Sequence, residues 1–166
     1  MPTHYQGRKE VIRALNAYIN LARASDSILS RLSVHSEAHD LTLGQFGILE
    51  SLLHLGPMCQ AELGKKLLRS GGNITTVLDN LERRNLVRRE RQKDDRRRIL
   101  IRLTAAGRRL ISAYFPSHAD VIAKEMSRLS PKEQEQLRCL CRKLGRGSKN
   151  QTYRTKENNN DKRSPQ

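Results

Sequence analysis

The chain has 166 residues, enough for one domain of ordinary size and a tail. Its 32 Lys and Arg residues outnumber its 17 Asp and Glu residues, and the formal net charge of +15 points to an acidic polymer such as nucleic acid as a partner. No apolar run approaches the roughly 20 residues that span a bilayer, the polar N-terminus lacks the apolar core of a secretory signal, and three cysteines are too few for a disulfide framework. We therefore expect a cytoplasmic protein with no membrane partner.

Two helices are predicted in the first third of the chain. Apolar residues recur at helical spacing from about Gly7 to Ala38, so this long helix has an apolar stripe that needs a second surface to cover it. Thr42 and Gln45 have the spacing of a capping box, which begins a second helix. Gly56 and Pro57 end that helix.

A short helix and a longer one follow. The short helix covers Gln60 to Leu68, and we expect Gly71-Gly72 to break it. The longer helix ends at Asn85, because the left-handed position after a helix suits Gly or Asn. Its inward-facing positions are Ile74, Val77, Leu78 and Leu81.

The periodicity then changes from helical to extended. Leu86–Arg91 and Ile99–Leu103 are β-like, and the charged segment Gln92–Arg98 between them predicts a hairpin with a basic tip. Thr104 can cap a fifth helix, which contains Pro116, a residue that can kink a helix.

The C-terminal part begins with a strong helix start signal. Ser130 is the expected N-cap, Pro131 suits the first helical position, and Glu133 completes a capping box. The tail from Gly145 has six basic and two acidic residues without apolar periodicity, and we expect it to be disordered. The apolar positions that this sixth helix should bury are Leu137, Leu140, Cys141 and Leu144.

This order of elements predicts a mainly α fold: a winged helix-turn-helix core with one β-hairpin wing and flanking helices. The flanking helices are too apolar to stand alone, so we expect a C₂ homodimer that presents two recognition helices about 34–36 Å apart. The expected segments are an N-terminal dimerisation helix (1–40), the DNA-binding core (41–104), C-terminal dimerisation helices (105–144) and a disordered basic tail (145–166).

Four motifs carry a family resemblance. Residues 95–107 (DRRRILIRLTAAG) have the pattern D-x-R…L-T-x-x-G, preceded by 41–46 (LTLGQF), 60–63 (QAEL) and 73–82 (NITTVLDNLE). From about residue 8 to 144 the chain therefore resembles the MarR family of bacterial transcriptional regulators. The resemblance implies a homodimeric regulator, usually a repressor, that binds a palindromic operator in double-stranded DNA. It also implies release by a small-molecule effector or an oxidant.

The chain departs from the family pattern at two positions. Asn85 stands where relatives usually have Gly, a change that the left-handed conformation tolerates. Cys59 stands where relatives commonly place Ser or Thr as the N-cap of the third helix.

The expected DNA contacts come from the recognition helix and the wing. Short polar side chains near the start of the fourth helix can reach base edges or phosphates, and the resemblance assigns Arg97 to the minor groove, with Asp95 holding its guanidinium or the loop. A solvated polar face and a charged turn would contain the same residue types. The predicted DNA-binding residues are Ser70, Asn73, Thr75, Thr76, Arg83, Arg84, Asp95, Arg96, Arg97 and Arg98; Arg88 and Arg89 also look like phosphate contacts.

An effector pocket and a redox site are further expectations. In relatives an effector binds between the dimerisation helices and the core, where Tyr18, Phe46 and His54 could lie. Cys59 is a candidate redox sensor because a helix N-terminus stabilises a thiolate, although Glu62 opposes this and a buried cysteine is usually inert.

Other function classes find little support in the sequence. His35 and His39 have a spacing suited to zinc but lack a matching ligand set, so we expect no metal and no cofactor. No catalytic motif is present, so we do not expect an enzyme or catalytic residues. The alternative function is a basic protein that binds nucleic acid without sequence preference, in an architectural or RNA-binding role.

Overall fold

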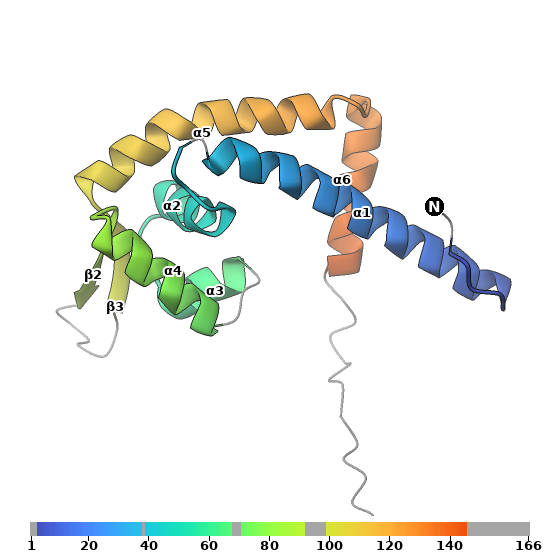
Figure 1. The fold of residues 1–166 in the computed structure, drawn as a ribbon, viewed down its shortest axis with the longest axis horizontal. Helices are drawn as coiled ribbons and strands as arrows, with labels where there is room; N and C mark the ends of the chain where they lie inside the picture. Colours follow the sequence, from blue (N-terminus) through green and yellow to red (C-terminus); the bar gives the residue numbers. More distant parts are fainter. Residues whose placement is uncertain (1–2, 38, 68–70, 92–98, 146–166) are drawn as a thin grey trace, which may run out of the picture. The chain divides into compact units, whose positions relative to one another are not determined.

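The computed structural model describes residues 3–37, 39–67, 71–91 and 99–145, with the backbone alone for 71–73 (Figure 1). The chain divides into two compact units, Met1–Glu125 and Met126–Gln166. The predicted basic tip of the hairpin and the predicted disordered tail after Gly145 lie outside the described residues.

All six predicted helices are present in the described part of the chain. Helix α5 runs through Pro116 without interruption. The helices are α1 (Lys9–Glu37), α2 (Leu43–Leu55), α3 (Gln60–Lys66), α4 (Gly71–Arg83), α5 (Ala105–Met126) and α6 (Pro131–Gly145).

The sheet contains the two predicted strands and one that the sequence analysis missed. Strands β2 (Val87–Arg91) and β3 (Ile99–Leu103) are antiparallel, with Val87 opposite Leu103 at the base of the hairpin. The additional strand β1 (Met58–Cys59) pairs with the other edge of β3, giving the order β1-β3-β2. A strand of two residues has no periodicity of its own, so only its pairing partner identifies it.

Gly71-Gly72 was expected to separate α3 from α4, and this expectation is wrong. Helix α3 ends at Lys66, and Gly71 and Gly72 belong to the first turn of α4. The first N–H groups of a helix have no intrahelical partner, and this end tolerates residues that would weaken a helix interior.

Local hydrogen bonds confirm the predicted helix starts. In α2 the Gln45 N–H donates to Thr42 Oγ1 at 3.2 Å, and the Thr42 N–H donates to Gln45 Oε1 at 3.0 Å. At α5 the Gly107 N–H donates to Thr104 Oγ1 at 3.0 Å, and at α6 the Ser130 N–H donates to Glu133 Oε2 at 2.8 Å. Each of these starts is encoded within four consecutive residues.

The junction between α4, β2 and α5 explains two of the motif residues. Asn85 has a φ of 53°, and the Leu86 N–H donates to Leu81 O at 2.9 Å, which closes α4 with a left-handed turn. A Cβ on Gly107 would lie only 1.9 Å from the Leu86 carbonyl oxygen. The last residue of the L-T-x-x-G pattern is therefore glycine because the first turn of α5 packs directly on this peptide.

Buried side chains from the helices and the sheet form one core in the first unit. One face of α4 is part of this core. The opposite face is therefore the one that is free for a partner. The core residues are Leu41, Phe46, Ile48, Leu49, Leu52, Leu63, Ile74, Leu78, Leu81, Leu86, Val87, Ile101, Ile111 and Tyr114.

The expected burial of α6 is wrong for the single chain. No residue of α6 is buried, and Leu140 and Leu144 are 61% and 68% exposed. The second unit contributes no other helix in its described residues, so the apolar stripe of α6 has no surface of its own unit to pack on.

Candidate nucleic-acid interface

Helix α4 turns a polar face outward at the predicted position. Ile74, Leu78 and Leu81 are fully buried, whereas Thr75 and Thr76 are exposed. Figure 1 shows α4 between α3 and the hairpin of β2 and β3, the arrangement of a winged helix-turn-helix. Asn73 lies in the first turn of α4, but its side chain and the whole of Ser70 are outside the described residues.

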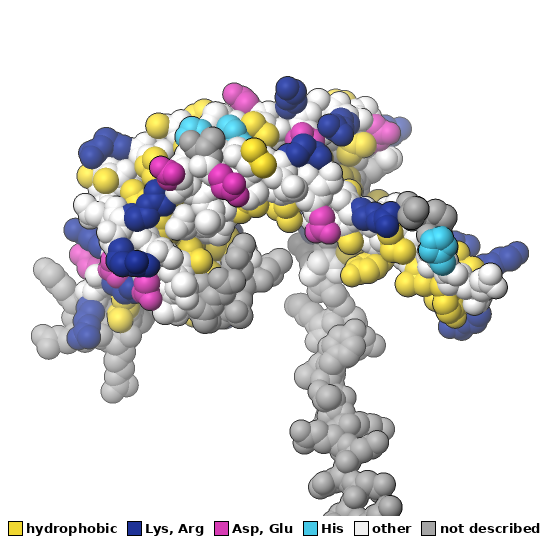
Figure 2. Space-filling model, in the orientation of Figure 1, with side chains coloured by type: hydrophobic (Ala, Val, Ile, Leu, Met, Phe, Trp, Pro, Cys, Tyr) yellow, Lys and Arg dark blue, Asp and Glu magenta, His cyan; other side chains and the backbone are white. Residues whose placement is uncertain are grey.

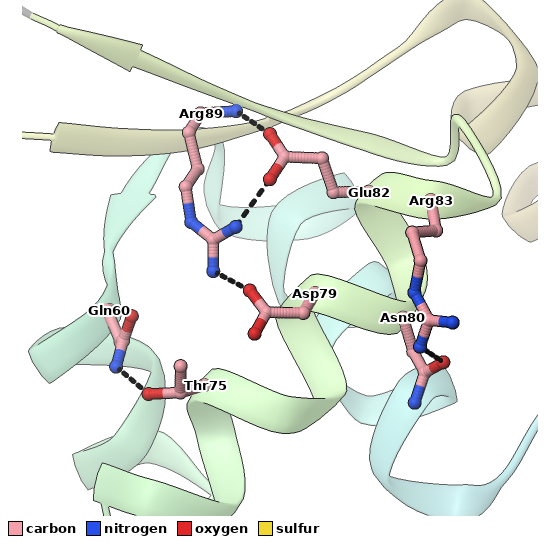
Figure 3. A network of polar contacts seen from close by, with 7 residues as sticks. All are labelled: Gln60, Thr75, Asp79, Asn80, Glu82, Arg83 and Arg89. Carbon is pink, nitrogen blue, oxygen red and sulfur yellow. Dashed lines mark hydrogen bonds and ion pairs between the residues drawn. The ribbon is translucent and has the colours of Figure 1, made fainter.

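A hydrogen bond joins the two helices of the helix-turn-helix. Gln60 Nε2 donates to Thr75 Oγ1 at 2.7 Å (Figure 3). The bond runs from the first residue of α3 to the outer face of α4, so it orients a side chain that was predicted to contact DNA. In the sequence Gln60 is recognisable only as part of a motif, and no role is predicted for it.

Arg89 of β2 binds two carboxylates of α4 (Figure 3). Its Nη2 donates to Asp79 Oδ1 at 2.6 Å, its Nη1 pairs with Glu82 Oε2, and its backbone N–H donates to Glu82 Oε1 at 3.0 Å. Partial burial lowers the pKa of Arg89, but the hydrogen bonds to the two carboxylates outweigh this effect and raise the pKa. Its guanidinium is thus engaged within the protein.

The two arginines at the end of α4 also have partners in the chain. Arg83 Nη2 donates to Asn80 Oδ1 at 2.5 Å on the same helix. Arg84 Nη1 donates to the Asp40 carbonyl oxygen at 2.5 Å and to Gln45 Oε1 at 3.4 Å, which ties the end of α4 to the start of α2. The acceptors in these hydrogen bonds are neutral, so they do not offset the positive charge of the two side chains.

Basic and acidic side chains are mixed around the hairpin. On the face that Figure 2 shows, Lys and Arg at this end of the molecule are interspersed with Asp and Glu. Glu90 of β2 pairs with Arg88 at 3.9 Å and with Arg102 of β3. The predicted wing-tip residues Asp95, Arg96, Arg97 and Arg98 lie outside the described part of the chain.

Cys59 lies where β1 meets α3. It is the N-cap residue of α3, its N–H donates to Glu62 Oε2 at 2.7 Å, and it is opposite Leu100 of β3. Its side chain is half-buried and the cysteine is free, as are the exposed Cys139 and Cys141 of α6. The redox role of Cys59 stays a prediction.

His35 of α1 and His39, which follows the end of α1, belong to an aromatic cluster that was not predicted from the sequence. The rings of His35 and His39 lie 5.5 Å apart, and both lie beside Tyr114 of α5. His118, one turn after Tyr114, is 4% exposed and accepts or donates a hydrogen bond with the Tyr114 hydroxyl at 3.3 Å. Burial and the nearby His35 lower the pKa of His118. Within the described residues, no group of three potential ligands could hold a metal ion.

One surface cavity contains a residue predicted for an effector pocket. His54 lines a cavity of about 360 Å³ between α2 and α3, and the centroid of its ring lies 4.6 Å from that of the Phe115 ring of α5. Phe46 instead packs in the core, and Tyr18 is exposed on α1. The other lining residues of this cavity are Glu50, Ser51, Leu55, Lys66 and Leu67.

No helix among the described residues is long and apolar enough to span a membrane.

Comparisons with known proteins agree with this architecture. The model of the MarR family matches residues 41–99. The HTH-type transcriptional regulator YkoM of Bacillus subtilis is 37% identical over 88% of this chain and 95% of its own length.

Solved structures share the fold. AbsC, a MarR family transcriptional regulator from Streptomyces coelicolor, superposes with a TM-score of 0.77 over 86% of this chain and 97% of its own, at 19% identity. MepR of S. aureus, solved in complex with DNA, superposes with a TM-score of 0.70 over 80% of this chain and 97% of its own, at 27% identity. The outward face of α4, the hairpin beside it and these similarities place the chain in the MarR family of transcriptional regulators.

Proposed function

We propose that the protein is a cytoplasmic repressor that binds a palindromic operator as a homodimer and is released by a small-molecule or oxidant signal. The observation that carries the proposal is the orientation of α4, whose apolar side is buried while Thr75 and Thr76 face outward beside the hairpin. A helix held in this way can enter the major groove of DNA. The DNA complex of MepR, a structural relative, supports the same use of the fold.

The proposed contacts divide into base readout and phosphate binding. Thr75, Thr76 and the start of α4 with Ser70 and Asn73 face the major groove, and the wing residues Asp95 to Arg98 face the minor groove. Arg83 and Arg84 supply positive charge at the other end of α4, where their neutral partners leave that charge available to phosphates.

The homodimer is supported by apolar side chains that the single chain leaves exposed. Monomeric proteins rarely expose contiguous apolar surface, and two copies related by a two-fold axis would cover it. The exposed apolar residues on the flanking helices are Tyr18, Leu21, Leu29, Val34, Ile122, Leu137, Leu140 and Leu144.

Two features at the ends of α3 support release by a signal. The cavity beside His54 has room for a small molecule, and Lys66 could pair with an acidic group on it. Its wall includes the end of α3, so an occupant could shift the helix that supports α4. Oxidation of Cys59 at the start of α3 would act on the same helix.

The proposal is tested by selecting duplexes from a random pool with the full-length protein. We expect an inverted repeat that binds about 10³-fold or more tightly than a scrambled duplex of the same composition. In binding assays Arg97→Ala should weaken the selected duplex by about 1–3 kcal/mol, and Asp95→Ala should weaken it despite the added positive charge. Equal affinity for the selected and scrambled duplexes would instead support the alternative, a basic protein without sequence preference.

A further inference from the structure

The ion-pair network of Arg89 connects the two parts of the proposed DNA interface. Asp79 and Glu82 are three residues apart on α4, so they lie on one face of the helix. Arg89 lies on β2 and binds both of them with its guanidinium and its backbone N–H (Figure 3). One residue of the hairpin thus holds one turn of the recognition helix.

Neighbouring charges on β2 belong to a different set of contacts. Side chains alternate between the two faces of a strand, so Arg88 and Glu90 lie on the face opposite to Arg89. Glu90 pairs with Arg88 and Arg102, both on the sheet itself. Breaking the Glu90 pairs therefore changes charge beside the interface without touching the link to α4.

The position of Arg89 along the strand allows it to fix the direction in which the hairpin extends. The base of the hairpin is held by the turn after α4, where the Leu86 N–H binds Leu81 O, and by the buried Val87. Arg89 lies two residues further out. A strand of five residues spans about 16 Å, so rotation by about 10° at its base would move its far end by roughly 3 Å. That displacement is close to the rise of one base pair, about 3.4 Å.

The charges of the network oppose simple attraction to DNA. Asp79 and Glu82 place two carboxylates on the helix that would approach phosphates, and Arg89 offsets only one of these charges. Arg89 itself is 28% exposed and both of its terminal nitrogens bind carboxylates, so it is poorly placed to bind phosphate. These three residues are therefore suited to holding the hairpin against α4, and they would be unfavourable as a surface that binds DNA.

We infer that Arg89 is a positioning residue that, through Asp79 and Glu82, fixes the hairpin against the recognition helix and so sets the spacing of the two DNA contacts. The inference rests on the proposed function, since it concerns how the same interface reads an operator. It assigns specificity to three residues that need not contact a base.

The test compares two variants with the same change in net charge. Asp79→Asn removes the charge of one of the two carboxylates that bind Arg89, and the matched control Glu90→Gln removes the charge of the carboxylate that pairs with Arg88 and Arg102 on the opposite face of β2. Full-length wild type and both variants are titrated with the duplex selected by the wild type and with its scrambled counterpart. Both variants gain one positive charge and should bind the scrambled duplex at least as tightly as the wild type does. Only Asp79→Asn should lower the ratio of the two affinities, by about tenfold, the discrimination that roughly one base pair carries.

A second pair of variants isolates the interaction itself. Arg89→Met keeps an apolar stem and removes the guanidinium, and it is measured alone and together with Asp79→Asn. If both residues act through one bridge, the double variant should lose no more specificity than Arg89→Met alone. Thermal melting identifies any variant that is not folded. When the selection is repeated with Asp79→Asn, the selected duplexes should show a weaker base preference on one side of the bases that α4 contacts.

The outcomes are distinguishable. A wild-type protein that does not discriminate between the duplexes contradicts the proposed function. A discriminating wild type with an unchanged affinity ratio in Arg89→Met, or with additive losses in the double variant, overturns the positioning role of Arg89 and leaves the proposed function standing.

Discussion

Helices α2 and α6 have similar lengths, 13 and 15 residues, and both carry leucines at helical spacing, yet their surroundings are opposite. Leu49 of α2 is fully buried by other parts of the same chain, whereas Leu140 of α6 is largely exposed. An apolar stripe therefore indicates that some surface covers the helix, but it does not identify that surface. The chain itself supplies that surface for α2, and we propose that a second copy supplies it for α6.

The largest expected effect separates these two helices directly. Leu49→Ala opens a cavity in the core and should lower the free energy of unfolding by about 3 kcal/mol in urea titrations. Leu140→Ala should change it by less than about 0.5 kcal/mol at low protein concentration, while weakening self-association in sedimentation. Similar losses in both variants would contradict the distinction between the two helices.

Two glycines sharpen the same contrast. Gly107→Ala drives a methyl group into the Leu86 carbonyl and should cost about 2 kcal/mol of stability, measured by thermal melting. Gly145 at the end of α6 has no atom within 4 Å of a built Cβ. Gly145→Ala is the control, and it should leave the melting temperature within error of the wild type.

Helix caps should give a smaller difference. Thr42→Ala removes the acceptor for the Gln45 N–H at the start of a core helix and should cost about 1 kcal/mol in global unfolding. Ser130→Ala removes the equivalent group from α6, where it should speed local amide exchange without shifting the main transition. A shift of that transition in Ser130→Ala would mean that α6 unfolds together with the core.

The smallest expected effect is a pH dependence. Burial and His35 lower the pKa of His118 below its ordinary 6.5, so the unfolded chain binds more protons than the folded chain once the pH falls below that value. Stability should therefore decrease as the pH falls through about 6.5, and His118→Gln should flatten this part of the profile.

A carboxyl on α6 titrates in a different window. Hydrogen bonds from the Ser130 side chain and backbone lower the pKa of Glu133, so the contribution of Glu133 to stability is lost only below its ordinary pKa of 4.5.

Identical melting profiles for wild type and His118→Gln from about pH 7.5 to pH 5 would exclude His118 as the cause of the pH dependence near 6.5.

The sequence predicted features that are encoded over a few neighbouring residues. The caps at Thr42, Thr104 and Ser130 and the left-handed Asn85 depend on hydrogen bonds within one turn, and all four are present. The sequence could not reveal β1, because a two-residue strand exists only through its pairing with β3.

Charge and burial were harder to predict because they depend on distant partners. Arg89 looked like one more basic residue of the wing, and only the fold brings it to Asp79 and Glu82. The leucines of α6 had the right spacing for burial, but none of them is buried. Boundaries also moved, since Gly71 begins α4 where a break was expected.

The closed base of the hairpin has a consequence for how this protein could change over evolution. The Thr104 N–H donates to the Leu86 carbonyl oxygen at 3.1 Å, and Val87 is opposite Leu103, so the two ends of the hairpin are held side by side. Insertions or deletions between Arg91 and Ile99 would then alter the reach of the hairpin while α4 and α5 keep their places, because a longer loop between fixed ends costs little. The hairpin can therefore diversify in length independently of the fold that carries it.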